Sequence, residues 1–472
     1  MKLTLSFALL SLAASPAFTA DWHMWGGSPQ RNMVNTVEKN IPTAWDVDTG
    51  KNIKWVAQLG SQSFGNPVVA GGKIFIGTNN QAERQPKVKG DKGVVMCFRE
   101  SDGKFLWQNV HDKLASGRVN DWPMQGICST CNVDGNRVYY VSNRCELVCS
   151  DVEGANDGSG APSGSGKILW KLDMMKELGV FPHNMSASSP NIDGDLVYVV
   201  TSNGVDESHI VIPSPDAPSF IAVNKLTGSV VWDKVGPGEK ILHGQWSSPA
   251  IGVIGGVKQI IFPGGDGQLY AFEPETGKEL WTFQCNPDGT VYKLGGRGTR
   301  NELIATPVIY NDRVYIAMGQ DPEHGEGPGH MYAIDATKRG DISKTRAVWR
   351  NDEVNRGLAT VSIYDSVLYH CDLSGNFRAI DPDTGKVLWK HEMGSAVWSS
   401  PYYVDGKVLM GDEDGHVVVF AAGKEKKIIN TIDMGGSVYT TPVAANGVLY
   451  ISTREKLYAI QQGASCNVKK VN

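Results

Sequence analysis

A short glycine-rich segment carries the most suggestive pair of charged side chains in the sequence. Residues 295–301 read GGRGTRN, which places Arg297 and Arg300 three positions apart among glycines. Guanidinium groups bind carboxylates through paired hydrogen bonds, and glycine lets a ligand approach the backbone closely. The segment therefore predicts an anion-binding loop. The alternative is a tight turn in which Arg300 forms an ion pair with Glu302 or Asp321.

A second glycine-rich segment combines imidazole and carboxylate side chains. Residues 319–330, GQDPEHGEGPGH, contain His324, His330 and Glu326. Nitrogen and oxygen donors of this kind form mixed ligand sets for divalent metal ions. These three residues are therefore candidate metal ligands, in a mixed set with Asp321 and Glu323 of the same segment. His183 and His243 could approach this set from neighbouring blades. The alternative is a solvated loop whose histidines make local hydrogen bonds.

Three further segments carry aromatic, imidazole and amide side chains, DWPMQG at 121–126, FPHNMS at 181–186 and HGQW at 243–246. The indole rings of Trp122 and Trp246 can stack on a planar ligand, or they can simply fill a channel. With the arginine loop, these segments supply the candidate cofactor- or ligand-binding residues Trp122, His183, Asn184, His243, Gln245, Trp246, Arg297, Arg300 and Asn301.

An internal repeat indicates the framework that positions these segments. Each unit has a small polar pair and Pro, two apolar runs around a turn, an Ala-containing strand, and Thr-Gly-Lys before Trp. The clearest copy, residues 247–281, contains four short apolar strands. The proline slot holds Pro67, Cys131, Pro190, Pro249, Pro307, Val361, Pro401 and Pro442. Eight such units predict an all-β fold, an eight-bladed β-propeller of four-stranded antiparallel blades.

The two ends of the chain complement each other in this pattern. The segment DVDTGKNIKW ends at Trp55 before the first unit begins, and the last unit stops at Ile460 without its own outer strand. Pairing the N-terminal strand with the C-terminal one closes the ring and removes exposed sheet edges. We therefore expect one propeller domain over residues 21–472.

The candidate residues lie where the repeat is lengthened. Successive proline slots are 54 to 64 residues apart in the first five units but 40 and 41 apart in the next two. Long loops after the second and fourth strands of a blade leave on the same face, and functional residues are common on such loops. Another insertion on this face is 204–219. We expect the inserted segments to form one decorated face around the central channel.

The cysteines could be buried packing residues or could form a disulfide. Cys97 and Cys149 occupy a slot that holds alanine in other units, which indicates buried packing residues. Cys128 and Cys131 stand three positions apart, and a disulfide between them would be strained along an extended strand.

The segments AFEPETGKELW (271–281) and AIDPDTGKVLW (379–389) resemble the tryptophan-docking repeat of quinoprotein dehydrogenases and of the outer-membrane assembly factor BamB. Both families are propellers. The chain departs from the dehydrogenases in having no adjacent cysteine pair and no CxxCH motif. We therefore expect a propeller that binds a small-molecule ligand or a protein partner on its decorated face.

The resemblance also implies two alternatives. In the first, the protein is a PQQ-dependent oxidoreductase acting on an alcohol or a sugar. PQQ, with calcium, would then lie against Trp122 or Trp246, Arg297 and Arg300 would hold it, and Asp321 would be the catalytic base. In the second, the protein is a BamB-like assembly scaffold.

Composition and the N-terminal residues limit the classes of protein, the partners and the cellular locations to be considered. The 472 residues are 41% apolar and 20% charged, which excludes a mainly disordered chain. A net charge of −5 without long basic runs indicates no nucleic-acid partner. Residues 1–20 read as a secretory signal peptide, and the first cysteine, Cys97, lies too far on for lipid attachment. We expect a periplasmic or secreted protein without a membrane anchor.

Overall fold

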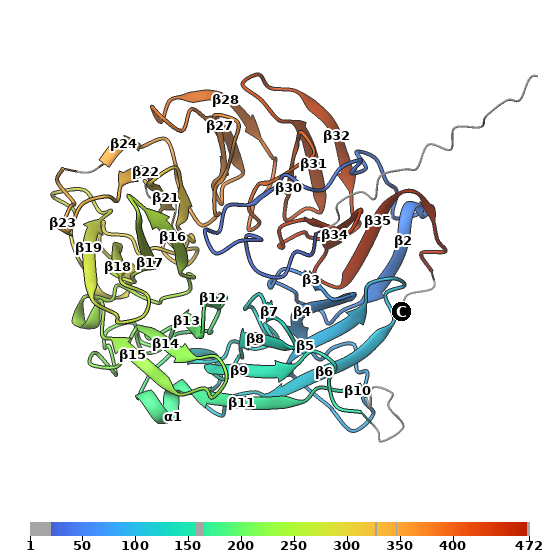
Figure 1. Cartoon of the computed structure of the whole chain (residues 1–472), viewed down its shortest axis with the longest axis horizontal. Helices are drawn as coiled ribbons and strands as arrows, with labels where there is room; N and C mark the ends of the chain where they lie inside the picture. Colours follow the sequence, from blue (N-terminus) through green and yellow to red (C-terminus); the bar gives the residue numbers. More distant parts are fainter. Residues whose placement is uncertain (1–19, 157–163, 326–327, 346, 470–472) are drawn as a thin grey trace, which may run out of the picture.

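The computed structural model describes residues 20–156, 164–325, 328–345 and 347–469. Their strands form eight sheets that radiate from a central axis (Figure 1). Each sheet contains a set of four antiparallel strands, and one α-helix, α1 (Met174–Leu178), occurs in the described chain. The prediction of an all-β, eight-bladed propeller is confirmed. Of the predicted signal peptide, residues 1–19 lie outside the described residues.

The first four blades follow one another along the chain. Blade one comprises β3 (Val68–Ala70), β4 (Lys73–Asn79), β5 (Lys92–Arg99) and β6 (Phe105–Asp112). Blade two comprises β7 (Asn132–Asp134), β8 (Arg137–Val141), β9 (Glu146–Asp151) and β11 (Ile168–Asp173). Blade three comprises β12 (Asn191–Asp193), β13 (Leu196–Val200), β14 (Phe220–Asn224) and β15 (Val230–Lys234). Blade four comprises β16 (Ala250–Ile254), β17 (Val257–Pro263), β18 (Gln268–Phe272) and β19 (Glu279–Gln284).

The next three blades repeat this order, and short strands extend three of the sheets. Blade five comprises β20 (Val308–Tyr310), β21 (Arg313–Met318), β22 (His330–Asp335) and β24 (Ala347–Asn351). Blade six comprises β25 (Ser362–Tyr364), β26 (Val367–Cys371), β27 (Asn376–Ile380) and β28 (Val387–Glu392). Blade seven comprises β29 (Tyr402–Val404), β30 (Lys407–Gly411), β31 (His416–Ala421) and β32 (Ile428–Asp433). The added parallel strands are β10 (Gly164–Ser165) on blade one, β23 (Gly340–Asp341) on blade four and β1 (Val34–Asn35) on blade seven.

The eighth blade joins the two ends of the chain. Its strands are β33 (Val443–Ala445), β34 (Val448–Ser452), β35 (Lys456–Ser465) and β2 (Lys51–Gln58). The outermost strand, β2, runs antiparallel to β35 with Trp55 opposite Ala459. The predicted closure of the ring by its terminal strands is confirmed (Figure 1).

Each repeat tryptophan docks one blade on the next. The indole of Trp55 faces Gly103 of blade one so closely that a Cβ there would lie 2.5 Å from the ring. Its Nε1 donates a 3.0 Å hydrogen bond to the carbonyl oxygen of Glu100 in the same turn. Glycine is required at this turn because it has a positive φ and no side chain. The same contact joins Trp107 to Gly154, Trp170 to Gly228, Trp232 to Gly277, and Trp349 to Gly385.

The N-terminal segment, residues 21–35, crosses the centre of the ring (dark blue in Figure 1). Arg31 in this segment is fully buried. Its guanidinium donates four hydrogen bonds of 2.8 to 3.0 Å to the carbonyl oxygens of Trp25, Ser189, Pro190 and Pro249. The segment therefore ties the innermost strands of blades three and four together, a role that its sequence, which lies outside the repeat, did not predict.

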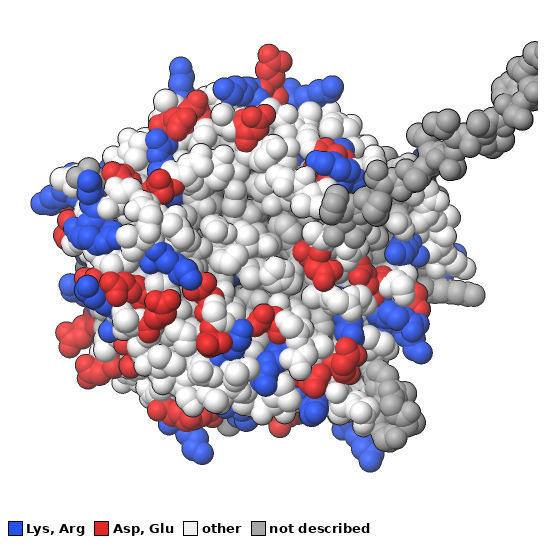
Figure 2. Space-filling view, viewed as in Figure 1, with Lys and Arg blue, Asp and Glu red and all other residues white. Residues whose placement is uncertain are grey.

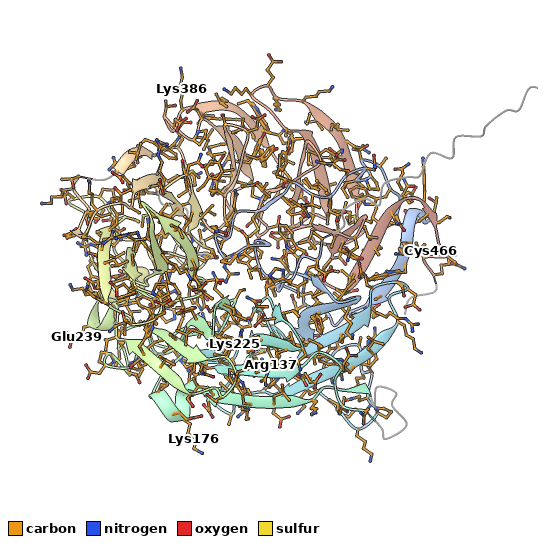
Figure 3. The ribbon with its side chains drawn as sticks, in the orientation of Figure 1. Arg137, Lys176, Lys225, Glu239, Lys386 and Cys466 are labelled. Carbon is orange, nitrogen blue, oxygen red and sulfur yellow. The ribbon has the colours of Figure 1, made fainter. Side chains whose placement is uncertain are left out.

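The outer surface carries charges of both signs. In the view of Figure 2 they are interspersed around the rim, whereas the centre of this face is uncharged. Figure 3 shows Lys176, Glu239 and Lys386 projecting outward from the edge of the ring. Among the described residues, no helix has the length and apolarity needed to cross a membrane. All eight cysteines fall in the described part of the chain, and all are free thiols.

Candidate functional site

A cavity of about 600 Å³ lies on the propeller axis. Each of the eight blades contributes to its wall the side chain three residues before the proline slot. These residues are Phe64, Cys128, Ala187, Trp246, Ile304, Leu358, Trp398 and Tyr439. Trp122 and, from the N-terminal segment, Trp25 add two further indole rings. The cavity is therefore the mouth of the central channel, with mainly aromatic and aliphatic walls.

A ring of polar side chains underlies this wall and explains the small polar residues of the repeat. The backbone N–H of the residue before the proline slot donates to the side-chain oxygen of the equivalent residue one blade further on. The bonds are 2.6 to 3.0 Å long and join Asn66 to Thr130, Thr130 to Ser189, Ser189 to Ser248, Thr360 to Ser400, Ser400 to Thr441, and Thr441 to Asn66. The inner end of each of these blades is thus positioned by its neighbour.

Acidic side chains outnumber basic ones in the lining of the cavity. Among the described lining residues, Asp321 and Glu323 are acidic, and Arg454 is the basic one. A cation or a neutral ligand fits this lining better than a multi-carboxylate quinone does, because an anion would face two carboxylates and one guanidinium. Without a bound cation, the described residues therefore do not provide the cationic surroundings that PQQ would require.

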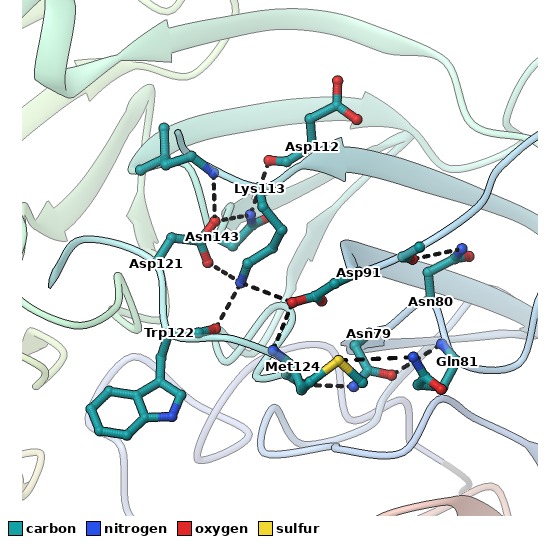
Figure 4. Close-up of polar contacts among 12 residues, drawn as sticks. Asn79, Asn80, Gln81, Asp91, Asp112, Lys113, Asp121, Trp122, Met124 and Asn143 are labelled. Carbon is teal, nitrogen blue, oxygen red and sulfur yellow. Dashed lines mark hydrogen bonds and ion pairs between the residues drawn. The ribbon is translucent and has the colours of Figure 1, made fainter. Parts of the chain in front are cut away.

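Trp122 is positioned by a buried polar network (Figure 4). The Asp121 carboxylate forms an ion pair with Lys113, accepts a 2.8 Å hydrogen bond from Asn143 Nδ2, and has a side chain only 2% exposed. Lys113 Nζ also donates a 2.7 Å bond to the Trp122 carbonyl oxygen. On the other side, the guanidinium of Arg118 lies 4.0 Å from the centre of the Trp122 ring. The indole is therefore held at the channel mouth.

Four histidines from four separate inserted segments gather beside the cavity. The ring centroids are 4.4 Å apart for His183 and His243, 4.6 Å for His209 and His243, and 4.7 Å for His243 and His324. His183 and His243 are buried, and His209 and His324 are partly exposed. The structure thus brings together segments that are far apart in the sequence.

His183 is held in one tautomer. Its Nδ1 donates a 2.8 Å hydrogen bond to the carbonyl oxygen of Val205, so Nε2 carries the lone pair. Nε2 is buried and has no hydrogen-bond partner among the described residues. Burial, together with the neighbouring His243, lowers the pKa of His183 to about 3. The imidazole is therefore neutral at pH 7, with its acceptor nitrogen directed into the cluster.

His243 lies at the centre of the cluster between two carboxylates. Its Nδ1 is 3.4 Å from Asp321 Oδ2, and its Nε2 is 3.7 Å from Glu323 Oε2. His324 Nδ1 donates a 2.6 Å hydrogen bond to the same oxygen of Asp321. Burial opposes the charge of Asp321, but His243 and His324 overcome this effect and lower the pKa of the carboxyl. Asp321 is therefore an anion that orients two imidazoles.

Two further acidic residues adjoin the cluster. Glu302 is buried, and its burial and the nearby Asp321 charge raise the pKa of its carboxyl well above the usual range. Glu323 is one-third exposed, and its Oε1 accepts a hydrogen bond of 3.4 Å from Asn184 Nδ2. Glu302 is thus the neutral member of the group, and Glu323 is positioned by a residue of another inserted segment.

The glycines of the predicted anion-binding loop lie against histidines. A Cβ at Gly295 would lie 2.5 Å from the carbonyl oxygen of His209, and one at Gly296 would lie 2.9 Å from His324 Nδ1. Both glycines have a positive φ, and their N–H groups donate to the carbonyl oxygen of Leu242. The close approach that these glycines permit is therefore to the histidine cluster.

The two arginines of this loop do not line the axial cavity. Arg297 Nη2 lies 3.5 Å from the carbonyl oxygen of Ser208 at the surface. Burial lowers the pKa of His209, and His243, His324 and, least of these, the positive charge of Arg297 add to this effect. Arg300 Nε is buried without a hydrogen-bond partner among the described residues. The loop thus borders the histidine cluster.

The other predicted residues have local partners. Gln245 Nε2 donates a 2.8 Å hydrogen bond to the Asn203 carbonyl oxygen, which ties blade three to blade four. Asn301 Nδ2 donates to the Pro328 carbonyl oxygen at 3.1 Å. His330 Nδ1 bonds Asp352 at 2.7 Å and is not part of the cluster. Glu326, the third predicted metal ligand, lies outside the described residues.

Sequence reasoning did not select His209 or Glu302 as site residues, and it included Glu323 only in the mixed ligand set of residues 319–330. His209 and Glu323 do fall within the inserted segments 204–219 and 319–330. A histidine or carboxylate in five of the six inserted segments of one face was the available signal. The spacing along the chain does not reveal which of them meet, because the contacts form between blades.

The sequence matches the family described as "Outer membrane protein assembly factor BamB" over residues 30–162, 91–346 and 329–427. The chain belongs to this family of PQQ-like repeat propellers. BamB of Yersinia pestis is 26% identical over 294 residues, which are 62% of this chain and 65% of that protein. Polyvinylalcohol dehydrogenase of a Pseudomonas species is 25% identical over 357 residues, 66% of this chain and 53% of that protein.

Solved structures show the same fold as this BamB-like chain. Quinohemoprotein alcohol dehydrogenase from Comamonas testosteroni superposes with a TM-score of 0.65 at 12% identity, covering 95% of this chain and 81% of that one. At this identity the likeness concerns the fold alone. The chain spans about half to two-thirds of the length of the curated relatives it matches. The chain is therefore similar both to assembly factors and to dehydrogenases, and the site must distinguish between these functions.

Proposed function

We propose that this protein is an extracytoplasmic propeller that binds a small-molecule ligand at the mouth of its channel. The observation that carries the proposal is the axial cavity of about 600 Å³, to which every blade contributes one side chain. Small-molecule sites are typically preformed cavities of about 300 to 1,000 Å³ with apolar walls and a few convergent polar groups. The cavity has these properties.

The wall indicates the chemistry of the ligand. The indoles of Trp122, Trp246 and Trp398 offer flat surfaces for a planar molecule. Asp321 and Glu323 place negative charge at one side of the cavity. A planar ligand that is neutral or positively charged is therefore preferred over an anion.

A binding titration with two planar dyes of opposite charge tests this preference. We expect proflavine, a planar cation, to quench tryptophan fluorescence in a saturable one-to-one manner. The anion 8-anilinonaphthalene-1-sulfonate should bind at least about tenfold more weakly, because the acidic side of the cavity repels it. Trp398→Ala should weaken proflavine binding about tenfold by removing one stacking surface.

A matched control keeps this test specific. Tyr292→Ala removes an aromatic ring that is 37% exposed, similar to Trp398 at 38%, but that does not line the cavity. Its proflavine affinity should equal that of the wild type. Equal affinity for the two dyes, or no effect of Trp398→Ala, would contradict ligand binding in the cavity.

The alternative of a PQQ-dependent oxidoreductase is supported by relatives named as dehydrogenases. The charges of the cavity weigh against it, so PQQ has no part in the proposal. Isothermal titration of PQQ with and without calcium tests this directly. Saturable one-to-one binding of PQQ would replace the proposal by the oxidoreductase hypothesis.

A protein partner on the same face is the scaffold alternative, and the match to BamB supports it. The inserted segment 204–219 presents Ile210 and Val211, whose side chains are 63% and 50% exposed. These residues lie outside the cavity lining. Ile210→Ser with Val211→Ser should therefore leave dye binding unchanged, whereas a partner that docks on this face would lose affinity for the same variant.

A further inference from the structure

The histidine cluster contains buried ring nitrogens without hydrogen-bond partners. His183 Nε2 and both ring nitrogens of His243 are buried and make no hydrogen bond among the described residues. The two side chains are 1% and 0% exposed. An unpaired buried polar atom is costly, so a fold rarely gathers several at one place without a ligand that satisfies them. The cluster therefore points to a bound group that supplies electron-pair acceptors.

The outer contacts of His183 and His243 leave the Nε2 atom of each ring facing the cluster. His183 donates from Nδ1 to the Val205 carbonyl oxygen, and His243 turns its Nδ1 toward the Asp321 carboxylate. Both rings are thus arranged to present Nε2 to the cluster. A ring whose other nitrogen faces a carbonyl or carboxylate is the usual setting of a metal-bound histidine, because the outer contact fixes the tautomer and raises the basicity of the ligating nitrogen.

The geometry points to a site for a divalent transition-metal ion, and we propose that its ligands are His183 Nε2, His209, His243 Nε2 and Glu323. The ligand atoms of these four residues lie within 4.8 Å of one another. Tetrahedral zinc has bonds of about 2.0 to 2.2 Å to nitrogen and oxygen, which brings its ligands to roughly 3.3 Å apart. Small movements of the four side chains would close the set around one ion. The partly exposed His209 and Glu323 supply that freedom.

The donor set selects the class of metal. Three imidazoles and one carboxylate suit zinc, cobalt, nickel, copper or iron, whereas calcium prefers oxygen ligands only. Charge is also balanced, since Glu323 and the ionised Asp321 neutralise a divalent cation. This site differs from the predicted set in 319–330, because His330 is paired with Asp352.

The site opens onto a second, smaller cavity of about 250 Å³. His183, His209 and Glu323 line it together with Arg118. Glu323 and Asn184 border this cavity and the axial cavity alike. A metal ion held here therefore lies between the two spaces and is reachable from solvent. The inference goes beyond ligand binding in the axial cavity and does not depend on it.

Asp321 is a positioning residue of this site. It contacts His243 Nδ1 and His324 Nδ1 and is not among the four proposed ligands. Asp321→Asn keeps the size of the side chain but loses the charge that orients His243. Loss of such an outer contact lowers metal affinity about 10- to 100-fold. A purely structural role of Asp321 would leave the affinity unchanged.

The test uses the whole protein, stripped of metal by a chelator and titrated with zinc in competition with a chromophoric indicator. We expect one zinc ion per chain, with loss of at least about 100-fold in affinity for His243→Ala and for His209→Ala, because each removes a ligand. His209 is partly exposed, so its variant keeps the fold even if the buried His243 variant does not. Cobalt in place of zinc should give the visible absorption bands of a tetrahedral nitrogen and oxygen site.

The matched control is His330→Ala, which removes a histidine of the same face that is hydrogen-bonded to Asp352. It should bind zinc as the wild type does. Wild-type protein without stoichiometric zinc binding, or His209→Ala with wild-type affinity, would overturn the proposal. Proflavine binding by the zinc-free protein distinguishes failure of this inference from failure of the axial ligand site.

Discussion

Trp281→Ala is expected to lower the free energy of unfolding by about 3 to 5 kcal/mol, the cost of removing a fully buried tryptophan. Trp281 is 0% exposed and packs between blades four and five, in a cluster that includes Ala333 and Ile334. Its Nε1 also donates a 2.6 Å hydrogen bond to Gln259 Oε1, which is left unpaired in the variant. Denaturant melts followed by circular dichroism measure the loss.

Trp398→Ala is the control for this experiment. Trp398 is 38% exposed at the channel mouth, so its removal should cost less than about 1 kcal/mol. A loss below about 1 kcal/mol for Trp281→Ala would show that the indole does not hold two blades together.

Arg31→Met is expected to destabilise the propeller by about 3 kcal/mol or more. The substitution keeps an unbranched side chain but removes every donor of the guanidinium. The carbonyl oxygens of Ser189, Pro190 and Pro249 would then lie buried without this partner, at about 1 to 3 kcal/mol for each that water does not reach. Denaturant melts give the change in free energy. Trp25 fluorescence should respond as well, because its carbonyl oxygen accepts from Arg31.

Arg99→Met is the matched control for Arg31. Arg99 pairs with Asp102 at the surface, where both side chains are nearly half exposed. An exposed ion pair contributes about 0 to 1 kcal/mol, so this variant should remain close to the wild type. Equal stability of the two variants would mean that the N-terminal segment does not fasten the inner strands.

The ring could be predicted from the sequence because each structural contact recurs. The turn glycine of the repeat is needed where the tryptophan of the preceding blade lies against it, as Gly277, which follows Thr276, shows for Trp232. The orphan strand ending at Trp55 predicted its pairing with the last unit. The passage of Arg31 through the centre was not predictable, since its partners are backbone carbonyl groups of blades three and four, which leave no pattern in side-chain type.

Only the face of the propeller that carries the candidate site could be predicted from the sequence. The inserted segments indicated where chemistry would gather, and His183, His243 and His324 do lie together. Arg297 was selected for its flanking glycines, but those glycines accommodate His209 and His324. The spacing of residues within one loop predicts only the turns of that loop. The cluster instead depends on the angle between neighbouring blades, which brings separate loops to one point.

The most direct test of a metal- and ligand-binding channel mouth is anomalous diffraction at the zinc absorption edge, from crystals grown with one equivalent of zinc. We predict a single strong peak bounded by His183, His209, His243 and Glu323. Absence of a peak there, or peaks confined to surface groups such as the pair of His330 and Asp352, would contradict the account.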